Sequence, residues 1–574
     1  MVDVTDRNAE FRTFVYWILI FVATGMMVGR ILTVAADHGR TPFLSANDRS
    51  RWCTIRALVD HGTYVIDDVV LKPDGESFDR DWHSIDMVRH KGHDGREHYY
   101  SSKPTLLPTM LAAEYWLIKQ TVGATLDRNP FYVGRVMLVV SNVVPLVLYF
   151  VLLVRLAERY GQTDWGRVFV VACATFATFL TTFSVTLNNH LPAAVSALVA
   201  VYATLSIWND EERRWRSFAV AGVFSAFTAA NELPALSFFV FVAAAVFYKA
   251  PKPALVAFLP AAALVAFGFF YTNHLAHNSW RPAYAHRNDG ELLMTFPGSG
   301  VKLISGPITE DLRMEIYAGT KDKDIELSSR ATVSEAPILN ERWKGSTVKQ
   351  RWILWDPEGN DRFTILLVGD DHPQLQVHAW DSWYEYETSY WRDEHKSDVD
   401  AGESRRMTYA FHCLVGDHGI LSLTPVWILS LIGAAMLLGQ KNCCGTYGTT
   451  FSAKMKNLLA FVGLKNSTDP ARYQLCTFAL MVVVLTCVCL AFYITRPVND
   501  RNYGGMSCGL RWMFWFTPLW LLVMIPATDA IADNRRWRTI AYFFIFVSVL
   551  SASYASLNPW VHPWIYSYLL YLSH

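Results

Sequence analysis

The sequence lacks the features that mark several common classes of protein. Its 51 basic and 51 acidic residues cancel, which excludes a bulk electrostatic attraction to nucleic acid. Its nine cysteines are too few and too scattered for a disulfide framework. There is no internal repeat of fixed period, and the polar stretch 280–405 contains neither a glycine-rich phosphate loop nor an HExxH metal motif. The function must therefore be read from other features.

Long apolar runs are abundant, and 52% of the residues are hydrophobic. The first run lacks a small-residue cleavage site, so we expect it to remain as a helix. The block 217–247 is too long for one span and is interrupted by Asn231-Glu232-Leu233-Pro234, which predicts two short helices. With these, the sequence predicts a multi-pass α-helical membrane protein with about 11 transmembrane helices. The runs of spanning length are 13–34, 133–154, 167–187, 190–208, 254–273, 419–439, 473–495, 511–529 and 539–557.

The basic residues predict how these helices are oriented. Five connections carry 16 basic and 7 acidic residues between them: 155–167, 209–217, 248–252, 440–472 and 530–538. By the positive-inside rule they face the cytoplasm, as does the N-terminus. The intervening segments then lie outside: 35–132, 274–418, 496–510 and 558–574. Since a span at 106–123 would invert every later loop, we interpret that segment as a juxtamembrane helix lying in the interface.

The large polar stretch suggests a separate domain. Within 280–405, apolar and polar residues alternate around Asp, Gly and Asn turns, which predicts a small β-rich extracytoplasmic insertion. The expected organisation is a membrane module over 1–279 that includes the outer loop 35–132, the insertion 280–405, and C-terminal membrane helices over 406–574.

Polar side chains gather at the predicted outer ends of the helices. Ionisable groups near the hydrocarbon are costly unless they line a cavity or pair with one another. Their placement on one side predicts a polar chamber, suited to a substrate with an anionic head group and a long apolar tail. The residues are Asp48, Arg49, Arg51, Lys103, Arg135, Asn188, Asn189, His190, Asn231, Glu232, His274, His277, Asp417, His418, Arg501, Asn502, Tyr503 and Arg511.

Several segments in a fixed order resemble a known family. They are "NDRSRWCTIRALVDHGTY", then "YYSSKPTLLPTMLAAEYWLI", then "NPFYVGRVMLVVSNVVPLVLYFVLLVRLAERYG", within about residues 10–275. This order is similar to the GT-C superfamily of integral-membrane glycosyltransferases, especially the family-39 protein mannosyltransferases and lipid A aminoarabinose transferases. "GDHGILSLTPVWILS" and "NYGGMSCGLRWMFWFTPLW" resemble bacterial relatives more loosely. The resemblance implies a GT-C-type helical bundle.

The resemblance also implies an activity and its partners. The expected reaction is inverting transfer of a sugar from a polyprenyl-phosphate donor to a lipid, glycan or protein acceptor. It would take place among membrane lipids on the outer, periplasmic face of a bacterial-type cytoplasmic (inner) membrane. The family often has Asp-Glu where this chain has Asp48-Arg49, and Glu-Lys-Pro-Pro where it has Ser102-Lys103-Pro104-Thr105. A divalent metal cofactor is therefore left open, and no metal ligand is assigned.

Roles for individual residues follow from this chemistry. Asp48 is the expected general base for the acceptor hydroxyl. The candidate residues also have structural interpretations. Asp48 could be a helix cap or an ion-pair partner, the basic residues could be interfacial anchors, and His190 could be a helix cap. The expected donor-phosphate ligands are Lys103, Arg135 and Arg511, and the expected cavity residues are Asn189, His190, Glu232, His418, Tyr503 and Arg501.

Two other functions fit parts of the pattern. A secondary transporter or lipid flippase could use the broken helix at Glu232 as its coupling site. A catalytically idle relative could bind a partner through the 280–405 insertion.

Overall fold

The computed structural model describes residues 4–209, 214–298, 303–320, 325–338, 348–370, 372–392, 395–439 and 475–573. The basic connection 440–472, expected in the cytoplasm, lies outside the described residues. Contacts between residues divide the chain into two units. The first comprises 1–55, 106–269 and 397–574, and the second comprises 56–105 and 270–396. The three-part division expected from the sequence stays a prediction.

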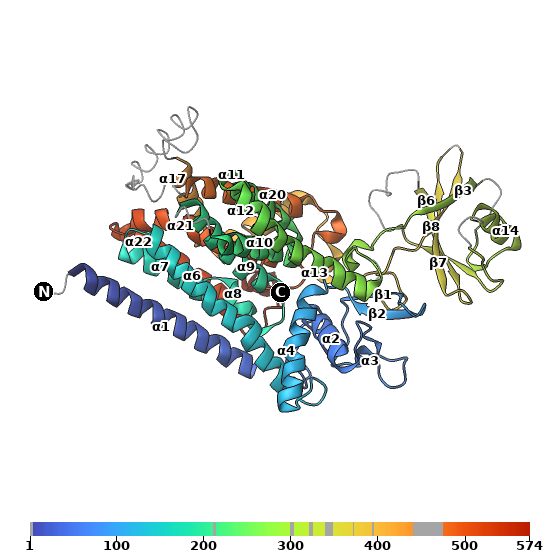
Figure 1. The fold of residues 1–574 in the computed structure, drawn as a ribbon. Coiled ribbons are helices and arrows are strands. Elements are labelled where there is room, and N and C mark those ends of the chain that lie inside the picture. The colour runs from blue at the N-terminus through green and yellow to red at the C-terminus, as the bar shows by residue number, and fades with distance from the viewer. Residues whose placement is uncertain are drawn as a thin grey trace. The chain divides into compact units, whose positions relative to one another are not determined.

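The first unit is a bundle of long helices (Figure 1). Eight helical segments of the described chain are long and apolar enough to cross a membrane, and Leu233–Lys249 and Trp427–Leu438 are shorter apolar helices. This confirms a multi-pass membrane protein, while the count of 11 stays a prediction. The eight segments are Asn8–Thr33, Pro130–Tyr160, Asp164–Val185, His190–Asn209, Pro251–His277, Cys476–Ile494, Arg511–Ile531 and Arg535–Tyr554.

The helices of this bundle follow the apolar runs closely. Two of the chain's helices contain the unit boundaries: α2 (Ala46–Asp60) and α13 (Leu259–His277). The others are α1 (Val4–Thr33), α4 (Leu106–Val122), α5 (Pro130–Leu138), α6 (Val144–Tyr160), α7 (Asp164–Phe176), α8 (Phe179–Thr182), α9 (His190–Asn209), α10 (Trp215–Asn231), α11 (Leu236–Lys249), α12 (Pro251–Pro253), α15 (Arg406–Leu414), α16 (Ile420–Leu423), α17 (Trp427–Leu438), α20 (Cys476–Ile494), α21 (Thr517–Ile531), α22 (Arg535–Tyr554) and α23 (Trp564–Ser573).

Burial separates the inner helices from the outer ones. In α9 most side chains are buried, as expected of a helix that is apolar all round. By contrast, α1 leaves large apolar side chains exposed, with Phe21 69% exposed. Such a surface is unfavourable in water but suits acyl chains. The bundle therefore has a protein core around α9 and lipid-facing helices such as α1.

The predicted break in block 217–247 is confirmed. Helix α10 ends at Asn231, the short helix η3 covers Leu233–Ala235, and α11 begins at Leu236. Pro234 lies in the first turn of the new helical segment, where its missing N–H costs nothing. Helix α4 forms over the segment expected in the interface and is not among the membrane-spanning candidates.

The second unit contains the predicted β-rich insertion. Its six antiparallel strands have the order β3-β8-β7-β6-β5-β4 (Figure 1). The helix α14 (Glu310–Gly319) contributes Leu312 and Ile316 to an apolar cluster with residues of the sheet. The strands are β3 (Leu292–Pro297), β4 (Gly306–Pro307), β5 (Thr332–Ala336), β6 (Val348–Asp356), β7 (Asp361–Val368) and β8 (Gln374–Ala379).

The same unit includes part of the first outer loop. There a short helix α3 (Asp67–Val70) precedes the hairpin of β1 (Met87–Lys91) and β2 (Glu97–Ser101), which the sequence did not predict. Val88 and Tyr100 from this hairpin pack with Trp383 in an apolar cluster. The second unit is thus assembled from two separate segments of the chain.

Candidate functional site

Asp48 lies in the first turn of α2 and is 1% exposed. Its backbone N–H donates to the Ser45 hydroxyl at 3.2 Å. Its Oδ1 accepts from the Trp52 indole at 2.7 Å and from the Leu187 backbone at 3.0 Å, while Oδ2 accepts from the Leu44 backbone at 3.0 Å. The carboxylate therefore ties the start of α2 to the segment that precedes α9.

The Asp48 carboxyl has a strongly altered affinity for protons. Burial raises its pKa from 3.8 to about 6, because the charged form loses its contact with water. Hydrogen bonds from Leu187, Leu44, the Thr186 side chain and Trp52 oppose this effect, since each stabilises the carboxylate. Asp48 consequently changes its protonation state close to neutral pH, as a general base requires.

A continuous chain of hydrogen bonds starts one turn further along α2. Arg51 donates through Nη2 to Asn189 Oδ1 at 2.6 Å, and Asn189 Nδ2 donates to Glu232 Oε1 at 2.7 Å. Asn189 Nδ2 also donates to the carbonyl of Asn231, at 3.0 Å. These hydrogen bonds therefore join α2, the start of α9 and the break between α10 and α11.

The series of hydrogen bonds continues through His190 to Arg511. Arg511 Nη1 lies 3.1 Å from His190 Nε2, and since a guanidinium only donates, Nε2 must accept. The proton of a neutral His190 is then on Nδ1, which donates to Glu232 Oε1. Both ends of the imidazole are thereby fixed in one tautomer.

One carboxylate oxygen of Glu232, Oε2, receives no hydrogen bond from a described residue. Its side chain is almost fully buried, yet both donors found in the described chain, Asn189 and His190, act on Oε1. Arg51 and Arg511 both act on it electrostatically. This leaves Oε2 available for a substrate group or a water molecule.

The loop before α21 holds Arg511 in place. Gly504 and Gly505 have φ angles of +95° and +77°, which favour glycine, and Arg511 Nε donates to the Gly504 carbonyl. A Cβ on Gly504 would lie 3.1 Å from Arg511 Nε. The Arg511 guanidinium also lies 5.0 Å from the centre of the Trp560 ring. The glycines therefore let the backbone approach the arginine closely.

Two further predicted cavity residues lie beside the same loop. The His418 ring stacks on Tyr503 with centres 4.3 Å apart, and its Nδ1 lies 3.0 Å from Asp417 Oδ1. His418 Nε2 is buried and has no hydrogen-bond partner within the described part of the chain. Tyr503 directly precedes Gly504, so the loop connects this pair to Arg511.

The other predicted residues make different contacts. Arg501 is buried and donates to the carbonyls of Arg496 and Ser404, at 2.8 and 2.9 Å, and its expected place in the cavity stays a prediction. Arg135 donates to the carbonyl of Val34 at 3.1 Å. Neither contact joins the Arg51–Arg511 chain.

Lys103 belongs to the second unit. Its Nζ lies 2.8 Å from Asp86 Oδ2, an ion pair that the spacing of the sequence did not reveal. Its expected role as a phosphate ligand stays a prediction.

An apolar groove begins next to Arg511. It is lined from η10 (Arg511–Phe516) and α21 by residues that include Leu510, Phe514 and Trp520, and from α16 and α17 by Leu423 and Trp427. The Arg511 side chain does not line this groove. Among the described residues, no group of three or more His, Cys, Asp or Glu side chains could hold a metal ion, so no metal ligand is assigned.

Sequence inspection missed Trp52, Leu187 and Trp560, all of which contact the site. Trp52 lies four residues after Asp48 on one helix, so its spacing could have indicated the contact. The Leu187 contact uses a backbone N–H and leaves no signal in the residue type. Trp560 lies in an aromatic-rich tail that predicts an interfacial belt, which concealed its contact with Arg511.

Comparison with known proteins gives likenesses of structure. No protein-family model and no curated protein matches the sequence. The S. cerevisiae protein O-mannosyltransferase Pmt1-Pmt2 complex bound to the sugar donor is similar at 11% identity and a TM-score of 0.42, over 98% of this chain and 91% of that chain. An Archaeoglobus fulgidus oligosaccharyltransferase in the apo form is similar at 11% identity and a TM-score of 0.39, over 97% of this chain and 60% of that chain.

The archaeal enzyme in complex with Zn and sulfate gives 12% identity and a TM-score of 0.35, over 95% of this chain and 53% of that chain. Because every TM-score is below 0.5, the site is interpreted from this chain's own residues.

Proposed function

We propose that this protein transfers a sugar from a polyprenyl-phosphate donor to an acceptor hydroxyl at the outer face of a cytoplasmic (inner) membrane. The observation that carries the proposal is the hydrogen-bond network from Arg51 through Asn189, Glu232 and His190 to Arg511, with buried Asp48 one turn before Arg51 on α2. These side chains are called the cluster. Buried ionisable groups are costly, and in a membrane protein they mark functional sites by default. The cluster combines carboxylates with arginine, as sugar transfer from a phosphate donor requires.

The chemistry assigns a role to each charge. The acceptor oxygen attacks the anomeric carbon, a new carbon–oxygen bond forms, and the bond to the phosphate oxygen breaks with its electron pair. The leaving phosphate gains negative charge, which Arg511 offsets by charge-assisted hydrogen bonds. The proton of the acceptor hydroxyl passes to Asp48. Attack from the face opposite the phosphate gives inversion.

The raised pKa of Asp48 supports its role as the base. A carboxyl that titrates at about 6 is ionised at neutral pH and is more basic than an ordinary aspartate. The Thr186 side chain stabilises the ionised form of this carboxyl and so lowers its pKa. An acceptor hydroxyl could stabilise the carboxylate in the same way, so Thr186 indicates where the nucleophile would bind.

Glu232 has a different proposed role. Its oxygen Oε1 accepts from both Asn189 and His190, and His190 in turn accepts from Arg511, so the carboxylate fixes the direction of the arginine. Its Oε2 could bind a hydroxyl of the transferred sugar.

A transfer assay with matched variants tests this function. Purified protein is incubated with labelled polyprenyl-phosphate sugars and a membrane extract that supplies the acceptor. Wild type should transfer label, and Glu232→Gln should lose most of the transfer. Glu114→Gln serves as the control, because Glu114 is another partly buried glutamate of the first unit, on α4 and outside the cluster.

Two outcomes would contradict the proposal. Equal transfer by wild type and Glu232→Gln would remove this carboxylate from the site. No transfer by wild type, together with Glu232-dependent substrate movement across proteoliposomes, would favour a transporter at the broken helix.

A further inference from the structure

Arg30 follows a long apolar stretch of helix α1, from Phe14 to Gly29. It lies in the last turn of α1, within the membrane-spanning segment Asn8–Thr33. Its side chain is half-buried and makes no hydrogen bond or ion pair with any residue that the structure describes. A half-buried arginine at the end of a membrane helix is unfavourable without an anionic or polar partner. The partner must therefore come from outside the described chain.

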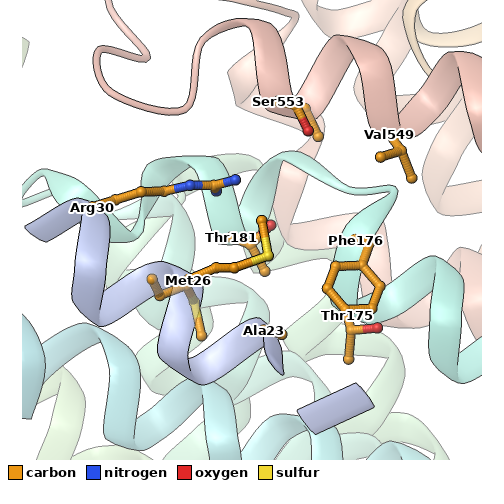
Figure 2. Close-up of a pocket in the computed structure, with 10 residues that line it drawn as sticks. Ala23, Met26, Arg30, Thr175, Phe176, Thr181, Val549 and Ser553 are labelled. Atoms are coloured by element: carbon orange, nitrogen blue, oxygen red, sulfur yellow. The ribbon is translucent and has the colours of Figure 1, made fainter. Parts of the chain in front are cut away.

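The Arg30 side chain lines a crevice between three helical segments. Figure 2 shows it extending from α1 toward Thr181 of α8, with Val549 and Ser553 of α22 across the opening. Met26 and Phe176 supply apolar walls below the guanidinium. The crevice thus combines a cationic part with an apolar part. These two parts complement the anionic phosphate and the apolar acyl chains of a phospholipid.

Hydroxyl groups add to the polar part of the crevice. Ser553 is exposed, and its hydroxyl makes no hydrogen bond with a described residue, so it is free to donate. Thr182, next to Thr181, donates instead to the Ala552 carbonyl at 2.7 Å and joins α8 to α22. That bond places the two walls at a fixed separation, and the crevice is therefore built into the helix packing.

The crevice lies where lipid head groups would be found. Arg30 and Ser553 both lie in the last turn of their helices, α1 and α22. Both helices leave large apolar side chains exposed nearby, with Phe21 69% and Phe546 65% exposed. These side chains face acyl chains in a membrane, so a lipid can reach the crevice sideways from the bilayer.

We propose that this crevice binds the phosphate group of an anionic glycerophospholipid. Arg30 donates N–H groups to the phosphate oxygens, as guanidinium groups do in bidentate contacts with phosphate. Ser553 donates a further hydrogen bond. One acyl chain lies against Met26 and Val549, so the lipid fastens α1 to α22. The bound lipid acts as a structural ligand, independent of the sugar-transfer proposal.

Native mass spectrometry of the full-length protein tests the site. Delipidated wild type, Arg30→Gln and Arg536→Gln are each titrated with phosphatidylglycerol, and the bound lipid is counted. Arg536 is a suitable control because it is an exposed arginine at the opposite end of α22. We expect Arg30→Gln to weaken the first binding step about 10-fold or more, as loss of a charge-assisted contact does, and Arg536→Gln to leave it unchanged.

Two further ligands and one conservative variant distinguish the sources of binding. Diacylglycerol lacks phosphate and should bind wild type and Arg30→Gln equally weakly, while Arg30→Lys should recover part of the phosphatidylglycerol affinity. Equal phosphatidylglycerol binding by wild type and Arg30→Gln would overturn the proposal. A second result would also overturn it: binding of a polyprenyl phosphate that depends on Arg30, with no binding of phosphatidylglycerol. That result would assign the crevice to the sugar donor.

Discussion

Replacing Asp48 by asparagine keeps the side-chain volume and removes the charge. The new amide can still accept the bonds from Trp52 and Leu187 through its oxygen. Its NH₂ group, however, would face the Leu44 N–H, which donates to Oδ2 in the wild type. The substitution therefore tests the base while perturbing one hydrogen bond of the native cluster.

The expected effect on stability is small because two terms oppose each other. Raising the pKa of Asp48 from 3.8 to about 6 corresponds to about 3 kcal/mol, an order-of-magnitude cost of burying the charge that asparagine does not carry. A mismatched buried donor costs about 1–3 kcal/mol. The unfolding midpoint should therefore stay close to that of the wild type.

The expected effect on activity is large. A positioned general base contributes about 10²–10⁴-fold, so the transfer rate per folded molecule at saturating donor should fall by that factor. The rate is measured with labelled donor, and the folded fraction is measured on the same sample by thermal unfolding in detergent. A folded Asp48→Asn protein that transfers sugar within about threefold of wild type would refute the role of Asp48, since the estimate requires at least about 10².

Four further predictions use the same assay or the same protein. The transfer rate should be constant above about pH 7, fall to about half near pH 6, and fall about tenfold per pH unit below about pH 5, because protonation at a pKa of about 6 removes the base. Trp52→Phe should move this fall to higher pH, since the indole N–H stabilises the carboxylate and lowers the pKa of Asp48; an unmoved profile would contradict the assignment. Arg511→Gln should raise the donor KM about 10- to 100-fold, whereas Arg536→Gln should not, and equal KM values would exclude a phosphate contact. Arg351→Met should destabilise the sheet by about 3–5 kcal/mol, because fully buried Arg351 pairs with two carboxylates; faster proteolysis of the insertion in the full-length protein measures this, and unchanged cleavage would argue against it.

Much of the bundle could be predicted from the sequence. Whether a segment forms a helix within a membrane depends on its own length and hydropathy, because lipid leaves the backbone no partner except itself. The break at Glu232 and the β-rich insertion were predictable for the same reason, since Pro234 and the alternation of residues act locally. Asp48, Glu232 and Arg511 stood out because ionisable groups near the hydrocarbon are costly unless they line a cavity or pair with one another.

The pairing of those charges was not predictable from local patterns. His190 and Arg511 are 321 residues apart, and only the packing of α9 against the loop before α21 brings them together. Lys103 and Arg501 belong to the same class of residue type and position as Arg511, yet one pairs with Asp86 and the other with backbone carbonyls. Residue type cannot distinguish these cases, because a cation binds whichever anion the fold places beside it.

The sequence by itself determined which segments are helices, which residues are costly to bury, and therefore at which end of the bundle chemistry is expected. The tertiary structure alone decided that Glu232 aligns His190 toward Arg511, that the Asp48 carboxylate accepts from three donors, and that Arg30 faces a crevice instead of an acid. The physical reason is that hydrophobicity acts on each segment separately, whereas hydrogen bonds and ion pairs depend on separations of about 3 Å that only the packed helices fix.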